Sequence, residues 1–78
     1  MEKNTLVLAP YNTEAMKLLL SVLVLKFNIK IFAIMFVKKL YKESYQTLDL
    51  CFKENPEMAD LIVSTYNKFY AMVLTKYN

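Results

Sequence analysis

The residues of this chain that could do chemistry are seven carboxylates, ten lysines, six tyrosines and the single cysteine Cys51, with no histidine. Proton transfer near neutral pH most often uses histidine, because the histidine pKa lies in that range. Glu54 and Glu57 are the nearest approach to a carboxylate pair, but their place beside Asn55-Pro56 fits a solvated helix end and a helix start. Cys51 falls on the expected apolar side of a helix, so we interpret it as a small core residue. We therefore expect no enzymatic activity and no catalytic residue.

Metal and nucleotide sites are also poorly supported. With no histidine and one cysteine, a metal would need clustered carboxylates, and these are spread from Glu2 to Asp60 without the spacing of a ligand set. The chain also contains no glycine. Phosphate-binding loops need glycine where the backbone approaches the phosphates, so a P-loop or a dinucleotide fingerprint is excluded. We expect no cofactor and no metal.

Binding chemistry is better represented, in a segment where lysines alternate with tyrosines. Lys38, Lys39 and Lys42 are close in sequence to Tyr41 and Tyr45. Tyrosine is enriched in protein-binding hot spots and lysine complements an acidic patch, so this segment is our first choice for a protein-binding surface. The second choice is the last expected helix, through three further tyrosines: Tyr66, Tyr70 and Tyr77.

The same alternation of lysine and tyrosine occurs in proteins that bind single-stranded nucleic acid. The chain has no arginine, however, so it cannot make the bidentate contacts that read guanine. Spread lysines are the usual solvated face of a helix. Nucleic-acid binding is therefore the third hypothesis, and it would be weak, non-specific and sensitive to salt.

The elements that carry these residues are expected to be helices, because a chain without glycine rarely makes many tight β-connections. Asn12 or Thr13 can cap the first helix. Asn55 offers an N-cap to the last helix, with Pro56 at its first position. The expected fold class is mostly α, one small domain of residues 1–78 built as a bundle of about three helices: 12–27, a second helix that starts at 29 or 37 and ends at 54, and 56–77.

The stretch 29–37 is the ambiguous part of this prediction. Its β-branched and aromatic residues favour a strand by propensity, and residues 5–9 could pair with it. That alternative is an α+β fold with a short two-stranded sheet. In the helical alternative the second helix extends back to 29, with Asn28 as a hinge, because asparagine tolerates the left-handed conformation that a helix end needs.

The chain also carries more apolar residues than a core of this size can bury. Hydrophobic residues make up 56% of the sequence, and a domain of this length buries only about 60% of the surface of its unfolded chain. The surplus predicts burial against a second copy, a partner protein or lipid. Residues 18–37 have the length of a membrane span, but Lys26 and Lys30 make insertion costly, whereas attachment at a membrane surface stays open.

The leading hypothesis is a small, non-catalytic protein-binding module, homodimeric when free, whose partner has an acidic patch. The unpaired Cys51 fits a reducing compartment, so we expect the cytoplasm. Lysine without arginine, together with abundant Asn, Ile, Phe, Tyr and Leu, is typical of an AT-rich genome such as that of a phage or another mobile element. The protein would then be an inhibitor that masks a surface of a host protein complex. A membrane-associated small hydrophobic protein is the alternative.

Overall fold

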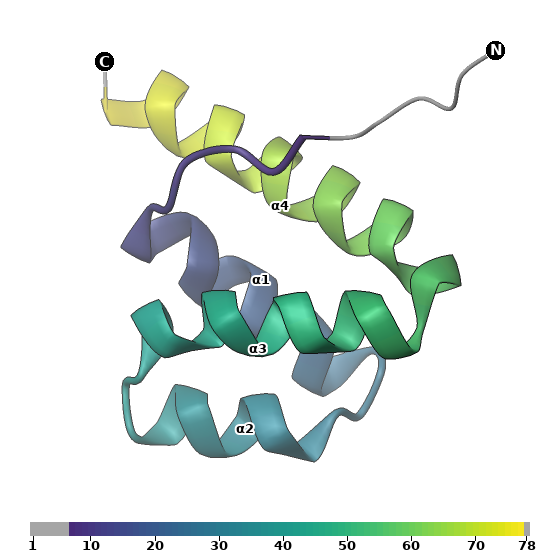
Figure 1. Ribbon diagram of the computed structural model, residues 1–78. Coiled ribbons are helices and arrows are strands. Elements are labelled where there is room, and N and C mark those ends of the chain that lie inside the picture. Colours follow the sequence, from purple (N-terminus) through teal and green to yellow (C-terminus); the bar gives the residue numbers. More distant parts are fainter. Residues whose placement is uncertain (1–6, 78) are drawn as a thin grey trace, which may run out of the picture.

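The computed structural model describes residues 7–77, which form four helices and no strand. This confirms the mostly helical prediction (Figure 1). The expected single helix ending at 54 is wrong, because two shorter helices occupy that stretch. The elements, in chain order, are α1 (Thr13–Leu25), α2 (Lys30–Val37), α3 (Tyr41–Glu54) and α4 (Pro56–Tyr77).

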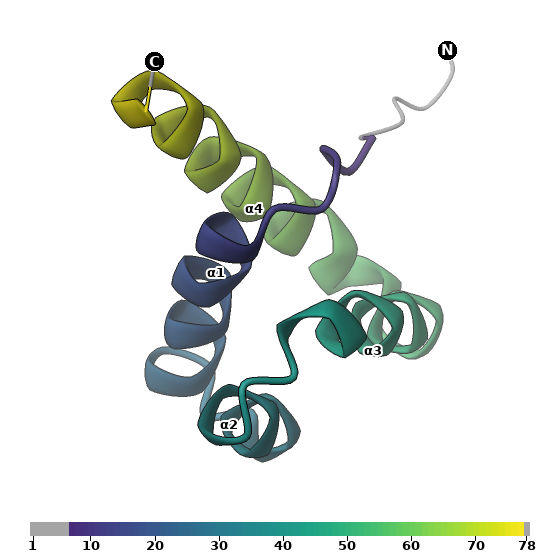
Figure 2. The same ribbon diagram turned by 90° about the vertical axis from the view of Figure 1, so that its left-hand side faces the viewer.

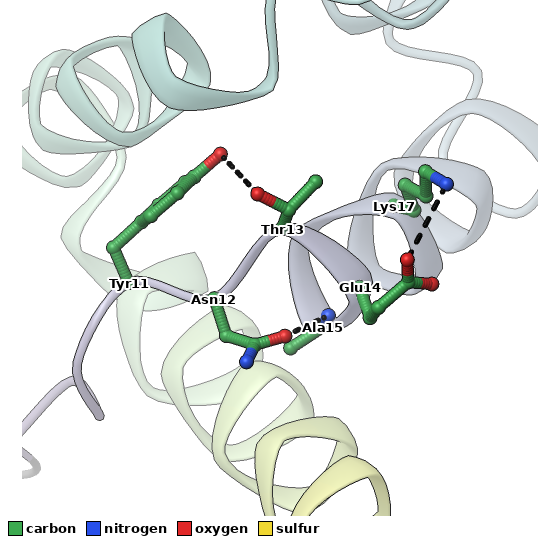
Figure 3. A network of polar contacts seen from close by, with 6 residues as sticks. All are labelled: Tyr11, Asn12, Thr13, Glu14, Ala15 and Lys17. Carbon is green, nitrogen blue, oxygen red and sulfur yellow. Dashed lines mark hydrogen bonds and ion pairs between the residues drawn. The ribbon is translucent and has the colours of Figure 1, made fainter.

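Helix α1 begins as its sequence predicts. The Asn12 side chain accepts a hydrogen bond from the Ala15 backbone N–H at 3.0 Å, which satisfies one of the free donors of the first turn (Figure 3). Glu14 lies in the same turn, against the positive end of the helix dipole, and its carboxylate is 3.5 Å from the Lys17 ammonium. The helix ends at Leu25, two residues before the predicted boundary.

The turn between α1 and α2 has the predicted asparagine hinge. Asn28 has a φ of 55°, in the left-handed region that asparagine tolerates better than most residues. Its N–H donates to the Val24 carbonyl at 3.1 Å, and the Ile29 N–H donates to the Leu23 carbonyl at 3.2 Å. These bonds satisfy two of the last carbonyls of α1 while the chain reverses direction.

The break between α2 and α3 was not predicted. Helix α2 closes with a Schellman pair, in which the Leu40 N–H donates to Met35 and the Lys39 N–H donates to Phe36, at 2.8 and 3.1 Å. Lys39 takes the left-handed position of that motif, with a φ of 62°. Lysine gives no sequence signal for this conformation, and the polar positions continue at helical spacing across it, so the stretch resembled one continuous helix.

The strand alternative for 29–37 is also wrong, because these residues form α2. Phe32 is fully buried, and Met35 and Phe36, three and four positions later, lie on the same side of the helix. Packing of this side against α1 and α3 overrides the β-propensity of the isoleucines and phenylalanines. Of the proposed partner 5–9, residues 7–9 have no regular structure, and 5 and 6 lie outside the described residues.

The core is built around α1, which contacts each of the other three helices. Figure 2 shows α1 between α4 and α2. This position explains why α1 has so thin a polar stripe, since a helix that is apolar almost all round must be covered on several sides. Buried apolar residues from all four helices form one cluster, and the buried Val63 lies outside it. The cluster contains Ala15, Met16, Leu19, Leu20, Leu23, Phe32, Leu48, Ile62, Tyr66 and Val73.

Candidate functional site

Two of the predicted binding tyrosines hold the chain segment before α1. Tyr66 is fully buried, and its hydroxyl donates to the Pro10 carbonyl at 2.9 Å while it accepts from the Asn12 N–H at 2.8 Å. The Tyr45 hydroxyl donates to the Ala9 carbonyl at 2.6 Å. Helix α4 adds Asn67, whose side chain bonds the backbone of Val7 and Ala9. The stretch 7–12 is thereby fixed across α4 (Figure 1).

These tyrosines pack against one another as well as against the backbone. Ring centroids are 5.7 Å apart for Tyr11 and Tyr45, 6.1 Å for Tyr45 and Tyr66, and 6.4 Å for Tyr66 and Tyr70. Burial raises the pKa of Tyr66 to about 12, and burial together with the Asp49 carboxylate raises the pKa of Tyr45. The structure therefore places Tyr66 where it cannot contact a partner, and makes Tyr45 and Tyr70 half-buried members of an internal cluster. The side chain of Tyr77 lies outside the described residues.

The lysines of the first-choice segment do lie together at the surface. Lys38 and Lys39 form the turn after α2, Lys42 is the second residue of α3, and all three are exposed. The half-buried Tyr41 ring lies below them, edge-on to Phe36 at 6.0 Å between centroids, and the Lys17 ammonium is 5.8 Å from its centroid. We call Lys38, Lys39, Tyr41 and Lys42 the basic turn.

Beside the basic turn lies a groove that the sequence did not reveal. A hollow of about 350 Å³ separates the first half of α1 from the last turns of α4, with Phe36 of α2 at one end. A second hollow, of about 470 Å³, separates the end of α1 from the first half of α4. Seven α4 residues line the two hollows, and five of them share one helix face at spacings of three and four: Leu61, Thr65, Lys68, Met72 and Lys76. On α1 the corresponding apolar stripe is Leu18, Val22 and Leu25.

The α1–α4 groove, defined by these two stripes, has an apolar floor and basic margins. Leu18, Leu61 and Met72 expose 40%, 48% and 53% of their surface in it. Four lysines border it, against one carboxylate, Glu14, which already pairs with a lysine: the lysines are Lys17, Lys26, Lys68 and Lys76. The groove therefore combines exposed apolar side chains with a positively charged border.

The breadth of the apolar face of the last helix is the feature of the sequence that relates to the groove. The predicted apolar face of the last helix extends from Met58 through Leu61 to Tyr70, which is broader than contact with one neighbouring helix needs. The structure buries the Tyr66 side of that face and leaves the Leu61 side open. The width of this face therefore matches one buried side and one exposed apolar side of the same helix.

The remaining candidate groups are not brought together for chemistry. Among the described residues, no three His, Cys, Asp or Glu side chains are grouped closely enough to hold a metal ion. Cys51 is half-buried, and burial together with the Glu54 carboxylate raises the pKa of its thiol. The thiol form therefore dominates at neutral pH, and the nucleophilic thiolate is suppressed.

Two further observations concern membrane crossing and similarity to known proteins. None of the helices described here has both the length and the apolar character that a transmembrane segment requires. The chain matches no known family model, no curated protein and no solved structure.

Proposed function

We propose that this protein acts without catalysis, by binding a protein partner that presents an acidic, amphipathic surface to the α1–α4 groove and the basic turn. The observation that carries the proposal is the exposed apolar floor of the groove, bordered on both helices by lysines. Exposed apolar side chains do not stabilise the free protein, whereas covering them lowers the free energy of a complex with a partner.

The shape of the groove suits one helix of a partner. The α4 stripe from Leu61 to Lys76 covers fifteen residue steps, which is about 22 Å at the rise of an α-helix. A partner helix of about four turns would therefore cover it, placing apolar side chains on Leu18 and Met72. Carboxylates on the sides of that helix would face Lys68 and Lys76.

This mode of action fits an inhibitor that masks a functional surface of a larger complex, and a phage or mobile-element source makes a host complex the natural target. Before it meets the partner, the free protein would be a homodimer that covers exposed apolar surface outside the lysine-bordered groove. Light scattering at micromolar concentration would then give a mass of about twice 9.2 kDa. A mass of a single chain would contradict the dimer without affecting the groove.

The groove is tested by affinity capture from host lysate with a variant that carries Leu18→Asp and Met72→Asp. Two carboxylates on the apolar floor should reduce capture of the partner at least about tenfold, since each removes apolar contact and repels an acidic helix. Leu50→Asp is the matched control, because Leu50 is 61% exposed on α3 outside both hollows. Equal capture by the groove variant, or equal loss in the control, would overturn the proposal.

A further inference from the structure

Helix α2 presents a second apolar surface, on the side of the molecule opposite α4 (Figures 1 and 2). Its inward residues are Phe32 and Met35, and the Met35 sulfur contacts the Ser44 hydroxyl at 3.5 Å. Its outward residues are aliphatic: Ile31, Ile34 and Val37 expose 46%, 50% and 77% of their surface. We call these three residues the α2 face, and it contains no hydrogen-bonding side chain.

Positive charge surrounds the α2 face at both ends. Lys26 and Lys30 precede it, Lys38 and Lys39 follow it, and all four are exposed. Residues 15–42 contain six lysines and no carboxylate, so the segment that forms and flanks α2 is basic throughout. Of the seven acidic residues, Glu2 and Glu14 precede this segment and the other five lie between Glu43 and Asp60. An occupant of the α2 face must therefore tolerate aliphatic side chains in its centre and carry negative charge around them.

A second copy of the chain does not meet this requirement. Two α2 faces packed in opposite directions would bring Lys30 of one copy to Lys38 of the other, and packing in the same direction would pair each lysine with its own counterpart. Both arrangements place like charges together at the rim of a small apolar contact, where they oppose association.

A protein partner also fits this face less well than it fits the groove. Protein hot spots are rich in aromatic and arginine side chains that fill pockets, and leucine and valine are under-represented there. The tyrosines that could serve as such anchors are turned inward, Tyr66 completely. The α2 face is instead aliphatic, with an open hollow of about 310 Å³ lined by Ala33, Ile34, Val37 and Lys38. Such a surface suits a fluid apolar medium, which adapts to the shape of the surface and needs no hydrogen bonds.

We propose that the α2 face rests on an anionic lipid bilayer, with α2 parallel to the membrane plane. Ile31, Ile34 and Val37 would enter the boundary between headgroups and acyl chains, and the lysines at the two ends of α2, Lys30, Lys38 and Lys39, would extend their stems toward the lipid phosphates. The helix is about 12 Å long, so only a small part of the protein would be immersed. The attachment would be reversible and would need anionic lipid, because three aliphatic side chains alone give little affinity.

The α1–α4 groove would remain accessible in this arrangement. Helix α2 and helix α4 lie on opposite sides of α1 (Figure 2), and α4 carries one wall of the groove. Membrane attachment would therefore concentrate the protein at a surface without blocking the groove, but it would engage Lys38 and Lys39 of the basic turn, so lipid and the protein partner would share that part of the surface. It does not depend on the proposed protein partner, and each proposal can fail alone.

The test is co-sedimentation with phosphatidylcholine vesicles prepared with and without phosphatidylglycerol. The protein should bind the vesicles with phosphatidylglycerol and not those without it, and salt should weaken binding because the lysine contribution is screened. A variant with Ile34→Asp and Val37→Asp should lose binding about tenfold or more, since it places carboxylates at an anionic surface. Circular dichroism must show unchanged helix content, as expected for substitutions at exposed positions.

A matched control variant distinguishes vesicle binding through the α2 face from non-specific adsorption. A control variant with Leu50→Asp and Leu74→Asp introduces the same two charges at exposed positions on α3 and α4, outside the groove, and should retain vesicle binding. Failure of the unmodified protein to bind anionic vesicles, or equal loss in this control, overturns the proposal. If the α2 variant instead keeps vesicle binding but loses a captured protein, the face belongs to a protein partner and the proposal is wrong.

A labelling experiment gives an independent readout of position. In a Cys51→Ser background, an environment-sensitive fluorophore attached through Val37→Cys should shift to shorter wavelength when anionic vesicles are added. The same fluorophore attached through Leu50→Cys should not shift, because that residue is carried by α3. A larger shift at the α3 position would show that another face meets the lipid, which would overturn the assignment.

Discussion

Tyr66→Phe removes one oxygen atom from the centre of the fold, and its effect on stability can be worked from the structure. The Tyr66 side chain is fully buried, and its hydroxyl makes two hydrogen bonds, to the Pro10 carbonyl at 2.9 Å and from the Asn12 N–H at 2.8 Å. Each such bond contributes roughly 0.5–1.5 kcal/mol net. The variant should therefore lose about 2 kcal/mol of unfolding free energy, or about 10 °C in Tm for a chain of this size.

The pH dependence gives a second consequence, which follows from the burial of the Tyr66 hydroxyl. Burial raises the pKa of Tyr66 from its ordinary value of 10.0 to about 12, so the folded state holds this proton more tightly than the unfolded state. The stabilisation from Tyr66 is complete below pH 10 and is lost as the pH rises from 10 to about 12. A shift of two pKa units corresponds to about 2–3 kcal/mol, which is similar to the loss expected from the substitution. The difference between the two proteins should therefore vanish near pH 12.

The assay is urea denaturation followed by far-ultraviolet circular dichroism, at neutral pH and at several alkaline pH values. Titration of lysines occurs in both proteins and cancels in the difference between them. Tyr11→Phe is the control, because the Tyr11 hydroxyl reaches only the exposed Thr13 side chain, at 3.2 Å (Figure 3). The reasoning is refuted if Tyr66→Phe loses less than about 0.5 kcal/mol at neutral pH, which is the size of an ordinary surface effect.

Three further predictions concern the turns and the basic surface. Lys39→Gly should stabilise the fold by about 1 kcal/mol in urea denaturation, because glycine adopts a φ of 62° without the strain of a Cβ atom; a loss of stability would contradict this. Asn12→Ala should cost about 1 kcal/mol by removing the cap of α1, and an unchanged midpoint would show that water replaces the cap. Changing Lys38, Lys39 and Lys42 together to Glu should weaken capture of the protein partner with an unchanged circular-dichroism spectrum, and undiminished capture would remove the basic turn from the binding surface.

The parts of the fold that the sequence predicts correctly are those with a local cause. Asn12 caps α1 because its side chain is the right length to reach the first-turn N–H groups, and Asn28 bends the chain because asparagine tolerates positive φ. Pro56 starts α4 for the same kind of local reason. The break at Lys39 has no such cause, because lysine adopts the left-handed conformation only when packing on both sides requires it. The count of helices therefore depends on tertiary structure.

The candidate site also has features with a local cause in the sequence and features that depend on tertiary structure. Three lysines close in sequence remain close in space, so the basic turn could be predicted from their spacing alone. The role of Tyr66 could not be predicted, because its hydroxyl bonds residues more than fifty positions away. Sequence composition identifies tyrosine as a residue with an apolar body and a polar tip, but either an interface or a core satisfies that description. The groove likewise depends on how α1 meets α4, which local patterns do not specify.

The inward use of the tyrosines also determines what kind of binding the surface can support. The Tyr45 and Tyr66 hydroxyls form hydrogen bonds with the backbone of residues 9–12. The exposed apolar surface therefore consists largely of aliphatic and methionine side chains, which form no directional bonds. Around these side chains the ionisable groups of the α2 face and the groove are lysines, with Glu14 paired. Affinity must then come from covered apolar area, and selectivity from the sign of charge. Surfaces of this kind discriminate strongly against basic partners and weakly among acidic ones, which is why both the protein test and the lipid test depend on introduced carboxylates.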